Sequence, residues 1–293
     1  MFAYIKKGYR SGILAIVIAI FMLPMLQGNV LACTREAACP GAFVTERANM
    51  VAIVDTDTAA DGYISICNTS PTKSKIKVIV LTPQGTYCQY TVFYTDSCTA
   101  KQIPLTGGDG TYTVRIYENT TGIAYRLFYL KEIAVHLSSE FAPFLCPNIY
   151  AEYTKDSQST VLAAELCKDA TTNWEKTEQI YQWITSTMIY DTEKAKAPPA
   201  LDTPDIDQVL SAKRGICLDV ASLTTVMLRS QGVPTKLVFG YVGETYHSWV
   251  LVFSDKEERW VLLDPTFGAA SDQGKDIMQF DQASAQYKMS FTY

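Results

Sequence analysis

The hydrophobic pattern changes once along this chain, near residue 144, and that change limits the folds available to it. From about Ala42 to Leu137 the sequence is rich in Thr, Tyr, Val and Ile, and Gly and Pro turn signals break it at the interval of short strands. Beyond Phe144 a helical pattern takes over, and strand-like runs return only later. The 293 residues therefore predict an all-β domain followed by an α+β domain.

The first region predicts an immunoglobulin-like β-sandwich over residues 33–140. Its last two strand-like runs form a hairpin around residues 118–122. No cluster of residues in it could perform chemistry, so we expect a spacer or a carbohydrate- or protein-binding module. His136 is predicted to be a structural strand residue. The strand-like runs are Lys75 to Val80, Tyr87 to Tyr94, Tyr112 to Tyr117 and Ile123 to Tyr129.

The second region, residues 141–293, predicts two helices followed by three strands. Apolar residues recur at helical spacing from Trp174 to Met188, with Thr171 or Thr172 as the N-cap. A polar loop follows, and a second helix begins near Cys217 and ends at Gly232. The loop is Glu193 to Pro204, and the strands are Thr235 to Val242, Tyr246 to Phe253 and Arg259 to Asp264.

The N-terminus predicts export. Basic residues precede an apolar run over residues 13–26, which is shorter than the roughly 20 residues that span a bilayer and contains Pro24. We expect a signal peptide over residues 1–32. Cys33 would then be the first mature residue, where a bacterial lipoprotein carries its lipid, although polar residues 27–29 interrupt the lipobox-like sequence. The expected location is secreted or attached to the outer face of the cell membrane, with a lipid anchor at Cys33 as the alternative.

The charge balance excludes one large class of partner. The net charge is −5, with 25 Lys and Arg against 30 Asp and Glu, and no basic stripe is visible. We therefore expect no nucleic-acid partner. The chain has only 2 His, so any imidazole chemistry must use His136 or His247.

The last two strands predict a pairing between His247 and Asp264. A hairpin that turns over Ser254 to Glu257 pairs Phe253 with Glu258, and this register places His247 opposite Asp264. Opposed residues on one face have Cβ atoms about 5 Å apart, within reach of an imidazole–carboxylate hydrogen bond. A slip of one residue would separate the pair.

Cys217 completes a set that can perform acyl transfer. A cysteine at a helix start lies beside unpaired N–H groups and the positive end of the helix dipole, and both favour the thiolate. A histidine that moves the proton and an aspartate that orients the histidine complete the logic of a thiol triad. Taken singly, Cys217 could instead be a half-cystine, His247 a strand residue and Asp264 a turn residue before Pro265. A zinc site lacks a visible fourth ligand.

At these residues the sequence resembles the transglutaminase-like superfamily, over roughly Thr171 to Phe267. By resemblance, the family's catalytic Cys, His and Asp correspond to Cys217, His247 and Asp264. The implied fold is papain-like α+β, with the cysteine at a helix start packed on an antiparallel sheet. The matching stretches are residues 176–184 leading to Tyr190-Asp191, then 214–221, 232–234, 240–242, 247–250 and 260–266.

The resemblance implies reaction type better than outcome. Family members include cross-linking transglutaminases, peptidases, deglycosylating amidases and inactive scaffolds. We expect a hydrolase acting on peptide or carboxamide bonds of a protein or peptide substrate, for example at the cell surface or in the cell wall. A glutamine–amine cross-linker and a non-catalytic binding protein are the alternatives. No metal or other cofactor is expected, since no EF-hand-like loop is visible. Backbone N–H groups at the Cys217 helix start are the expected oxyanion donors, and Trp249 could line the cleft or lie in the core.

The cysteine count bears on export. If Cys217 of the 8 Cys stays free, seven remain, an odd number that cannot all pair within one chain. Lipidation of Cys33 would leave six. Of the 15 connectivities open to six cysteines, the local one pairs Cys88 with Cys98, Cys146 with Cys167, and Cys39 with Cys67.

Overall fold

The computed structural model describes residues 51–97, 99–197, 203–270 and 286–293. The predicted signal peptide, residues 1–32, and Cys33 lie outside the described residues. Within the described ranges, no helix has the length and apolar character needed to cross a membrane. The described residues all belong to one compact unit, so the boundary predicted near residue 140 stays a prediction.

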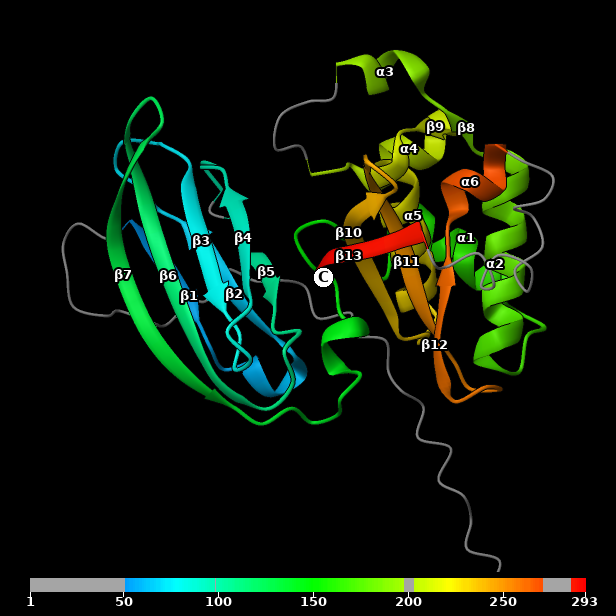
Figure 1. The fold of residues 1–293 in the computed structure, drawn as a ribbon, viewed down its shortest axis with the longest axis horizontal. Coiled ribbons are helices and arrows are strands. Elements are labelled where there is room, and N and C mark those ends of the chain that lie inside the picture. The colour runs from blue at the N-terminus through cyan, green and yellow to red at the C-terminus, as the bar shows by residue number, and fades with distance from the viewer. Residues whose placement is uncertain (1–50, 98, 198–202, 271–285) are drawn as a thin grey trace, which may run out of the picture. The chain divides into compact units, whose positions relative to one another are not determined.

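The N-terminal region is rich in antiparallel strands, as predicted, and forms a three-stranded sheet β1-β2-β5 and a four-stranded sheet β4-β3-β6-β7 (Figure 1). The inward side chains of β3 alternate with partly exposed ones, as expected of a sheet with one buried face. The immunoglobulin-like character of the region stays a prediction. The strands are β1 (Ala52–Asp55), β2 (Tyr63–Asn68), β3 (Ile76–Leu81), β4 (Tyr87–Val92), β5 (Lys101–Pro104), β6 (Gly110–Thr121) and β7 (Ala124–Val135).

The predicted hairpin in this region is confirmed, with longer strands than the sequence indicated. Strands β6 and β7 pair along nearly their whole length and turn at residues 122–123. The expectation for His136 is wrong, because it lies just beyond the end of β7 and is exposed to solvent. Its Nδ1 atom lies 3.4 Å from Oδ2 of Asp109.

The C-terminal region is α+β, as predicted, with a four-stranded antiparallel sheet in the order β12-β11-β10-β13 (Figure 1). Helix α5 packs against β10 and β11 and against helices α1, α2 and α4. The helices are α1 (Gln158–Leu166), α2 (Asn173–Thr187), α3 (Thr192–Lys196), α4 (Ile206–Ala212), α5 (Cys217–Ser230) and α6 (Pro265–Ala270); the strands are β8 (Ile189–Tyr190), β9 (Arg214–Gly215), β10 (Thr235–Val242), β11 (Thr245–Ser254), β12 (Arg259–Leu263) and β13 (Tyr287–Thr292).

Helix α2 begins where the sequence predicted. The Thr172 side chain accepts a hydrogen bond from the backbone N–H of Glu175 at 3.1 Å, and the Glu175 carboxylate accepts one from the backbone N–H of Thr172 at 3.1 Å. This reciprocal capping box satisfies two backbone donors at the start of the helix. Its apolar face, including Trp174, Ile180 and Ile184, is buried.

Several elements differ from the expectation of two helices and three strands. Helices α1, α4 and α6 and the short strands β8 and β9 were not predicted, and two further differences involve α3 and β13. The segment predicted as a loop from Glu193 to Pro204 contains most of the short helix α3, which Asp191 caps by accepting hydrogen bonds from two backbone N–H groups. The sheet also has a fourth strand, β13, which pairs with β10. Gly240 of β10 allows this approach, because a Cβ atom there would lie 2.1 Å from the carbonyl oxygen of Lys288.

The predicted disulfide pairs are mostly wrong. Cys88 and Cys167 are free cysteines, so neither Cys88–Cys98 nor Cys146–Cys167 forms. Cys167 points its thiol at the carbonyl of Lys176, at 3.8 Å. Cys67 is disulfide-bonded. Cys39, its predicted partner, lies outside the described residues.

Candidate active site

Cys217 is the first residue of α5, as the sequence predicted. The preceding residue, Ile216, has an extended backbone, so the chain turns sharply into the helix at the cysteine. The Oδ2 atom of Asp219 accepts a hydrogen bond from the backbone N–H of Ile216 at 2.9 Å and fixes this turn. Cys217 is partly exposed, so its sulfur lies at the start of a helix and within reach of a ligand.

The turn before Cys217 depends on a close approach between Gly215 and Asp219. A Cβ atom on Gly215 would lie 2.5 Å from the Cβ atom of Asp219, so only glycine fits there. The buried Asp219 carboxylate also pairs with the Lys194 ammonium group of α3, at 2.8 and 2.9 Å. One carboxylate therefore fastens both the start of α5 and the short helix α3.

His247 on β11 and Asp264 lie in direct contact. The Nε2 atom of His247 is 2.6 Å from Oδ2 of Asp264. The predicted register was nevertheless wrong, because the observed pairs include Phe253 with Trp260 and Ser254 with Arg259. The four-residue turn starts one residue later than predicted, which moves every pair by two positions. A shift of two keeps each side chain on its original face, so the two residues still meet.

Asp264 caps helix α6 while it holds the imidazole. Its Oδ1 atom accepts hydrogen bonds from the backbone N–H groups of Thr266 and Phe267, both at 3.0 Å. Its Oδ2 atom accepts a second hydrogen bond, from the hydroxyl of Tyr287 at 3.0 Å. The buried carboxylate therefore has four donors in all, which fix its orientation.

The pKa of His247 depends on competing effects. Burial alone would lower it, but hydrogen bonds to the side chains of Asp264 and Cys217, and their charges, raise it from 6.5 to about 10. Nε2 is engaged by Asp264, so Nδ1 is the ring atom left to face Cys217. The imidazole is therefore protonated at neutral pH, and its positive charge lies beside the Cys217 side chain.

Trp249 belongs to the core and does not line the pocket beside Cys217. Its ring stacks on His247 with centroids 6.2 Å apart and meets the ring of Tyr287 edge-on at 5.1 Å. The sequence left its position open between cleft and core. The structure assigns it to support the imidazole from one side.

A pocket of about 500 Å³ opens beside Cys217. Its lining includes residues from the start of α5, from β10 and β11, from β4 and from the turn at Ile149 and Tyr150. The volume falls in the range of small-molecule sites in proteins. A substrate group could therefore lie next to the sulfur while the remainder of the substrate stays outside.

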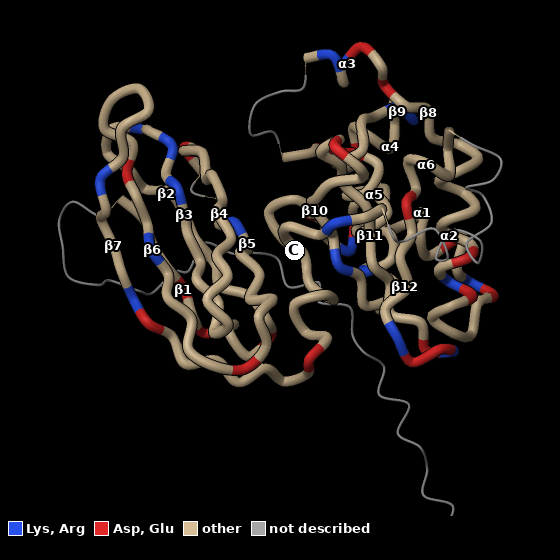
Figure 2. Tube along the Cα trace, viewed as in Figure 1, with Lys and Arg blue, Asp and Glu red and all other residues tan. Residues whose placement is uncertain are grey.

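Basic and acidic residues are interspersed along the described chain (Figure 2), and strand β11, which carries His247, has no Lys, Arg, Asp or Glu. This distribution agrees with the absence of a basic stripe in the sequence.

The sequence did not predict the roles of Tyr287, Asp219 and Lys194. Tyr287 lies on the strand that was missed, so no pattern connected it with Asp264. Asp219 carried a usable signal, because an acidic residue three positions after a helix N-cap is typical of a capping interaction. Lys194 lay in a segment predicted as loop, where nothing indicated its partner.

Comparison with known proteins gives a family match in the C-terminal region. A family model described as the transglutaminase-like superfamily matches residues 160–265. The uncharacterized protein YebA of Bacillus subtilis (strain 168) is 28% identical over 179 residues, which cover 54% of this chain and 24% of that protein. This chain thus spans about a quarter of the length of the curated relative that it matches.

Two solved structures are also similar. A candidate cysteine protease from Cytophaga hutchinsonii is 17% identical with a TM-score of 0.39, covering 75% of this chain and 78% of that one. Legionella pneumophila LapG is 14% identical with a TM-score of 0.36, covering 48% of this chain and 77% of that one.

Proposed function

We propose that the chain is a thiol enzyme that acts on peptide or carboxamide bonds through Cys217, His247 and Asp264. The premise is that the model of the transglutaminase-like superfamily matches residues 160–265. The observation that carries the proposal is the contact chain itself: Asp264 to His247 at 2.6 Å, and His247 to the Cys217 side chain at the start of α5. This arrangement supports roles for Cys217 as nucleophile, His247 as proton carrier and Asp264 as orienting group in acyl transfer.

The proposed reaction has two stages. The Cys217 thiolate attacks the carbonyl carbon, and the C–S bond forms as the carbonyl π electrons move to oxygen. Backbone N–H groups at the start of α5 are the natural donors to that oxyanion. His247 then donates its proton to the leaving nitrogen, the C–N bond breaks, and an amine departs from a thioester.

The second stage releases the acyl group. His247, now neutral, accepts a proton from water as the water oxygen attacks the thioester carbonyl, and the C–S bond breaks to return the thiolate–imidazolium pair. Asp264 keeps the imidazole in one orientation through both stages and compensates its positive charge.

We favour water over an amine as the second reactant. A cross-linking reaction must bring a lysine amine, which is protonated at neutral pH, next to the thioester. The acidic residue among the described lining of the pocket is Asp219, and its carboxylate already pairs with Lys194. This leaves no described carboxylate beside Cys217 to attract the ammonium group, so hydrolysis is the main expected outcome.

Chemical modification tests the proposal without a known substrate. Iodoacetamide should alkylate Cys217 much faster than the free cysteines Cys88 and Cys167, because burial raises the pKa of both of those thiols. The peptide map of the labelled protein gives the three rates. Equal rates would contradict the assignment of Cys217 as the nucleophile.

Turnover gives the second test. The protein is incubated with a glutamine-donor protein and a fluorescent amine, and the products are cleavage fragments for a hydrolase or incorporated label for a cross-linker. Cys217→Ala should abolish either product, whereas Cys88→Ala, which removes a buried thiol outside the site, should keep it. Continued turnover by Cys217→Ala would refute the proposal.

We also propose that the protein works outside the cytoplasm, secreted or held at the outer face of the membrane. The support is the apolar run that follows basic residues at the N-terminus. Intact mass of the protein isolated from its source distinguishes cleavage after Ala32, lipidation at Cys33 and an uncleaved chain.

A further inference from the structure

The pocket beside Cys217 has a lining that selects for one kind of side chain. Aromatic and aliphatic residues make up most of it, among them Ile149, Tyr150, Tyr190, Ile216, Phe239 and Tyr246. Burial of apolar surface against such a lining stabilises a complex by about 25 cal/mol per Å². Side chains with little apolar surface gain little from it.

The charges in the pocket are already compensated. Lys194 and Asp219 both line it, but they pair with each other at 2.8 Å. A charged ligand group would lose its hydration without gaining an unoccupied partner among the described lining residues. The pocket therefore disfavours Lys, Arg, Asp and Glu side chains.

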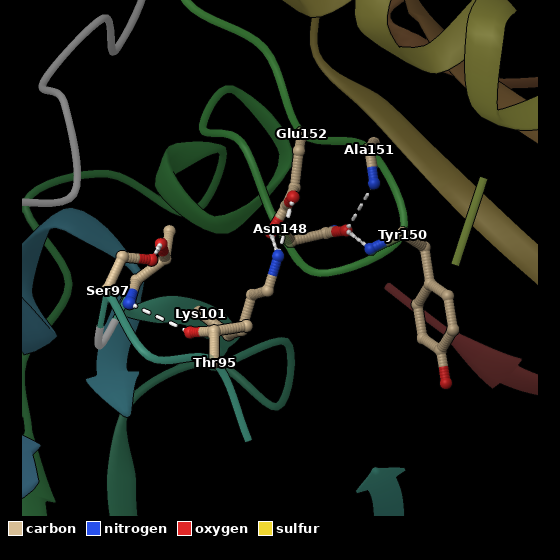
Figure 3. A network of polar contacts seen from close by, with 8 residues as sticks. Thr95, Ser97, Lys101, Asn148, Tyr150, Ala151 and Glu152 are labelled. Carbon is tan, nitrogen blue, oxygen red and sulfur yellow. Dashed lines mark hydrogen bonds and ion pairs between the residues drawn. The ribbon is translucent and has the colours of Figure 1, made fainter. Parts of the chain in front are cut away.

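The aromatic side of the pocket is held in place by its neighbours. Oδ1 of Asn148 accepts hydrogen bonds from the backbone N–H groups of Tyr150 and Ala151, at 2.9 and 3.1 Å, and this turn orients Tyr150 (Figure 3). The Tyr150 ring then packs on Phe239, with centroids 5.2 Å apart, and Phe239 contacts Tyr246 at 6.4 Å. A lining fixed in this way requires little ordering when a ligand binds.

Strand β4 adds uncharged polar groups to the same lining. Gln89 and Thr91 both lie on it. An amide and a hydroxyl can hydrogen-bond a peptide backbone without attracting a charged side chain. Both properties fit a peptide whose side chain enters the pocket and whose backbone stays at its mouth.

We propose that this pocket binds an uncharged aromatic or branched aliphatic side chain of the acyl-donor peptide, within two residues of the carbonyl that Cys217 attacks. The inference rests on the proposed function, since it concerns the substrate of the same nucleophile. It assigns specificity to Tyr150, Phe239 and Tyr246.

Peptide chloromethyl ketones test this specificity directly. The probes are N-acetyl dipeptides in which one residue is Gly and the other is Phe, Leu, Gly, Lys or Glu, with the varied residue placed in each position in turn. The Cys217 sulfur displaces chloride from the probe, so a C–S bond forms as the C–Cl bond breaks, and intact mass follows the rate. In one of the two positions, Phe and Leu should react at least ten times faster than Gly, Lys and Glu.

A matched pair of variants locates the effect. Tyr246 and Tyr87 are exposed to similar extents, 53% and 55%, but only Tyr246 is among the described lining residues of the pocket. Tyr246→Ala should reduce the ratio of the Phe-probe rate to the iodoacetamide rate at least threefold. Tyr87→Ala should leave that ratio and both rates unchanged.

The controls separate this proposal from the one on which it rests. If iodoacetamide fails to label Cys217 faster than Cys88 and Cys167, the proposed nucleophile is wrong. If Cys217 reacts rapidly but Phe and Leu probes are no faster than Gly, Lys and Glu probes, the proposed specificity alone is overturned. Equal loss of the ratio in Tyr246→Ala and Tyr87→Ala would also overturn it.

Discussion

Replacing Arg229 by methionine should destabilise the C-terminal region by about 3 kcal/mol. Arg229 lies near the end of α5 and is fully buried. Its guanidinium group donates four hydrogen bonds, all to backbone carbonyls: two to Thr235 at 2.9 and 2.7 Å, one to Cys146 at 2.7 Å and one to Tyr293 at 2.8 Å. One side chain thus joins α5 to three separate segments of the chain.

The expected loss of free energy follows from the buried carbonyl groups that methionine would leave without a hydrogen-bond donor. The Tyr293 carbonyl keeps a hydrogen bond from the backbone N–H of Leu237 at 2.8 Å, so it stays satisfied. The carbonyls of Cys146 and Thr235 lose the arginine, and a buried acceptor without a partner costs about 1–3 kcal/mol. Relief from burying the charge offsets part of the total, since burial lowers the pKa of Arg229 to about 10. The net loss is therefore about 3 kcal/mol.

Urea unfolding followed by tryptophan fluorescence measures this loss, because all 4 Trp lie beyond residue 170 and report on the C-terminal region. Arg259→Met is the control. Arg259 is half-exposed and pairs with Glu257, so its loss should cost less than about 1 kcal/mol. If Arg229→Met costs no more than this control, the carbonyl network does not stabilise the fold as we argue.

Three further changes test the arrangement around the nucleophile. Asp264→Asn should lower the pKa of His247, which NMR titration can follow. In the unmodified protein the pKa of His247 is raised by folding, so the stabilisation from the charged imidazole should be complete below about pH 6.5 and lost as the pH rises through about 10. Tyr287→Phe should reduce kcat several-fold with little change in KM, and an unchanged pH profile would refute a role in orienting Asp264. Asp219→Ala should lower the free energy of unfolding by about 1–3 kcal/mol, because it removes the helix cap and the partner of Lys194. A thermal unfolding midpoint equal to that of the unmodified protein would contradict a stabilising role for Asp219.

The sequence predicted the elements of the C-terminal region better than their connections. Local patterns of apolar residues and caps predict strands β10, β11 and β12 and the start of α5, and the structure contains these elements. Strand β13 has no such signal, because its side chains are exposed or only partly buried and the strand forms by pairing with β10, which is distant in sequence. Tyr287 could not be predicted for the same reason.

Arg229 shows a second limit. A basic residue in the last turn of a helix ordinarily faces water and complements the helix dipole, so the sequence gives no reason to bury it. Burial becomes favourable only because the carbonyls of Cys146, Thr235 and Tyr293 converge on one point. That convergence is a property of the tertiary fold, and no local pattern encodes it.

The contact between His247 and Asp264 depends less on hairpin register than the sequence argument assumed. Strand β12 ends at Leu263, so Asp264 lies beyond the last paired residue of the hairpin. Its orientation comes from capping α6, where two backbone N–H groups hold Oδ1 and leave Oδ2 directed at the imidazole. An error of one turn residue therefore changed every predicted pair and left the meeting of the two side chains intact. Substitutions within the β11–β12 turn should therefore change the free energy of unfolding while they leave the pKa of His247 unchanged.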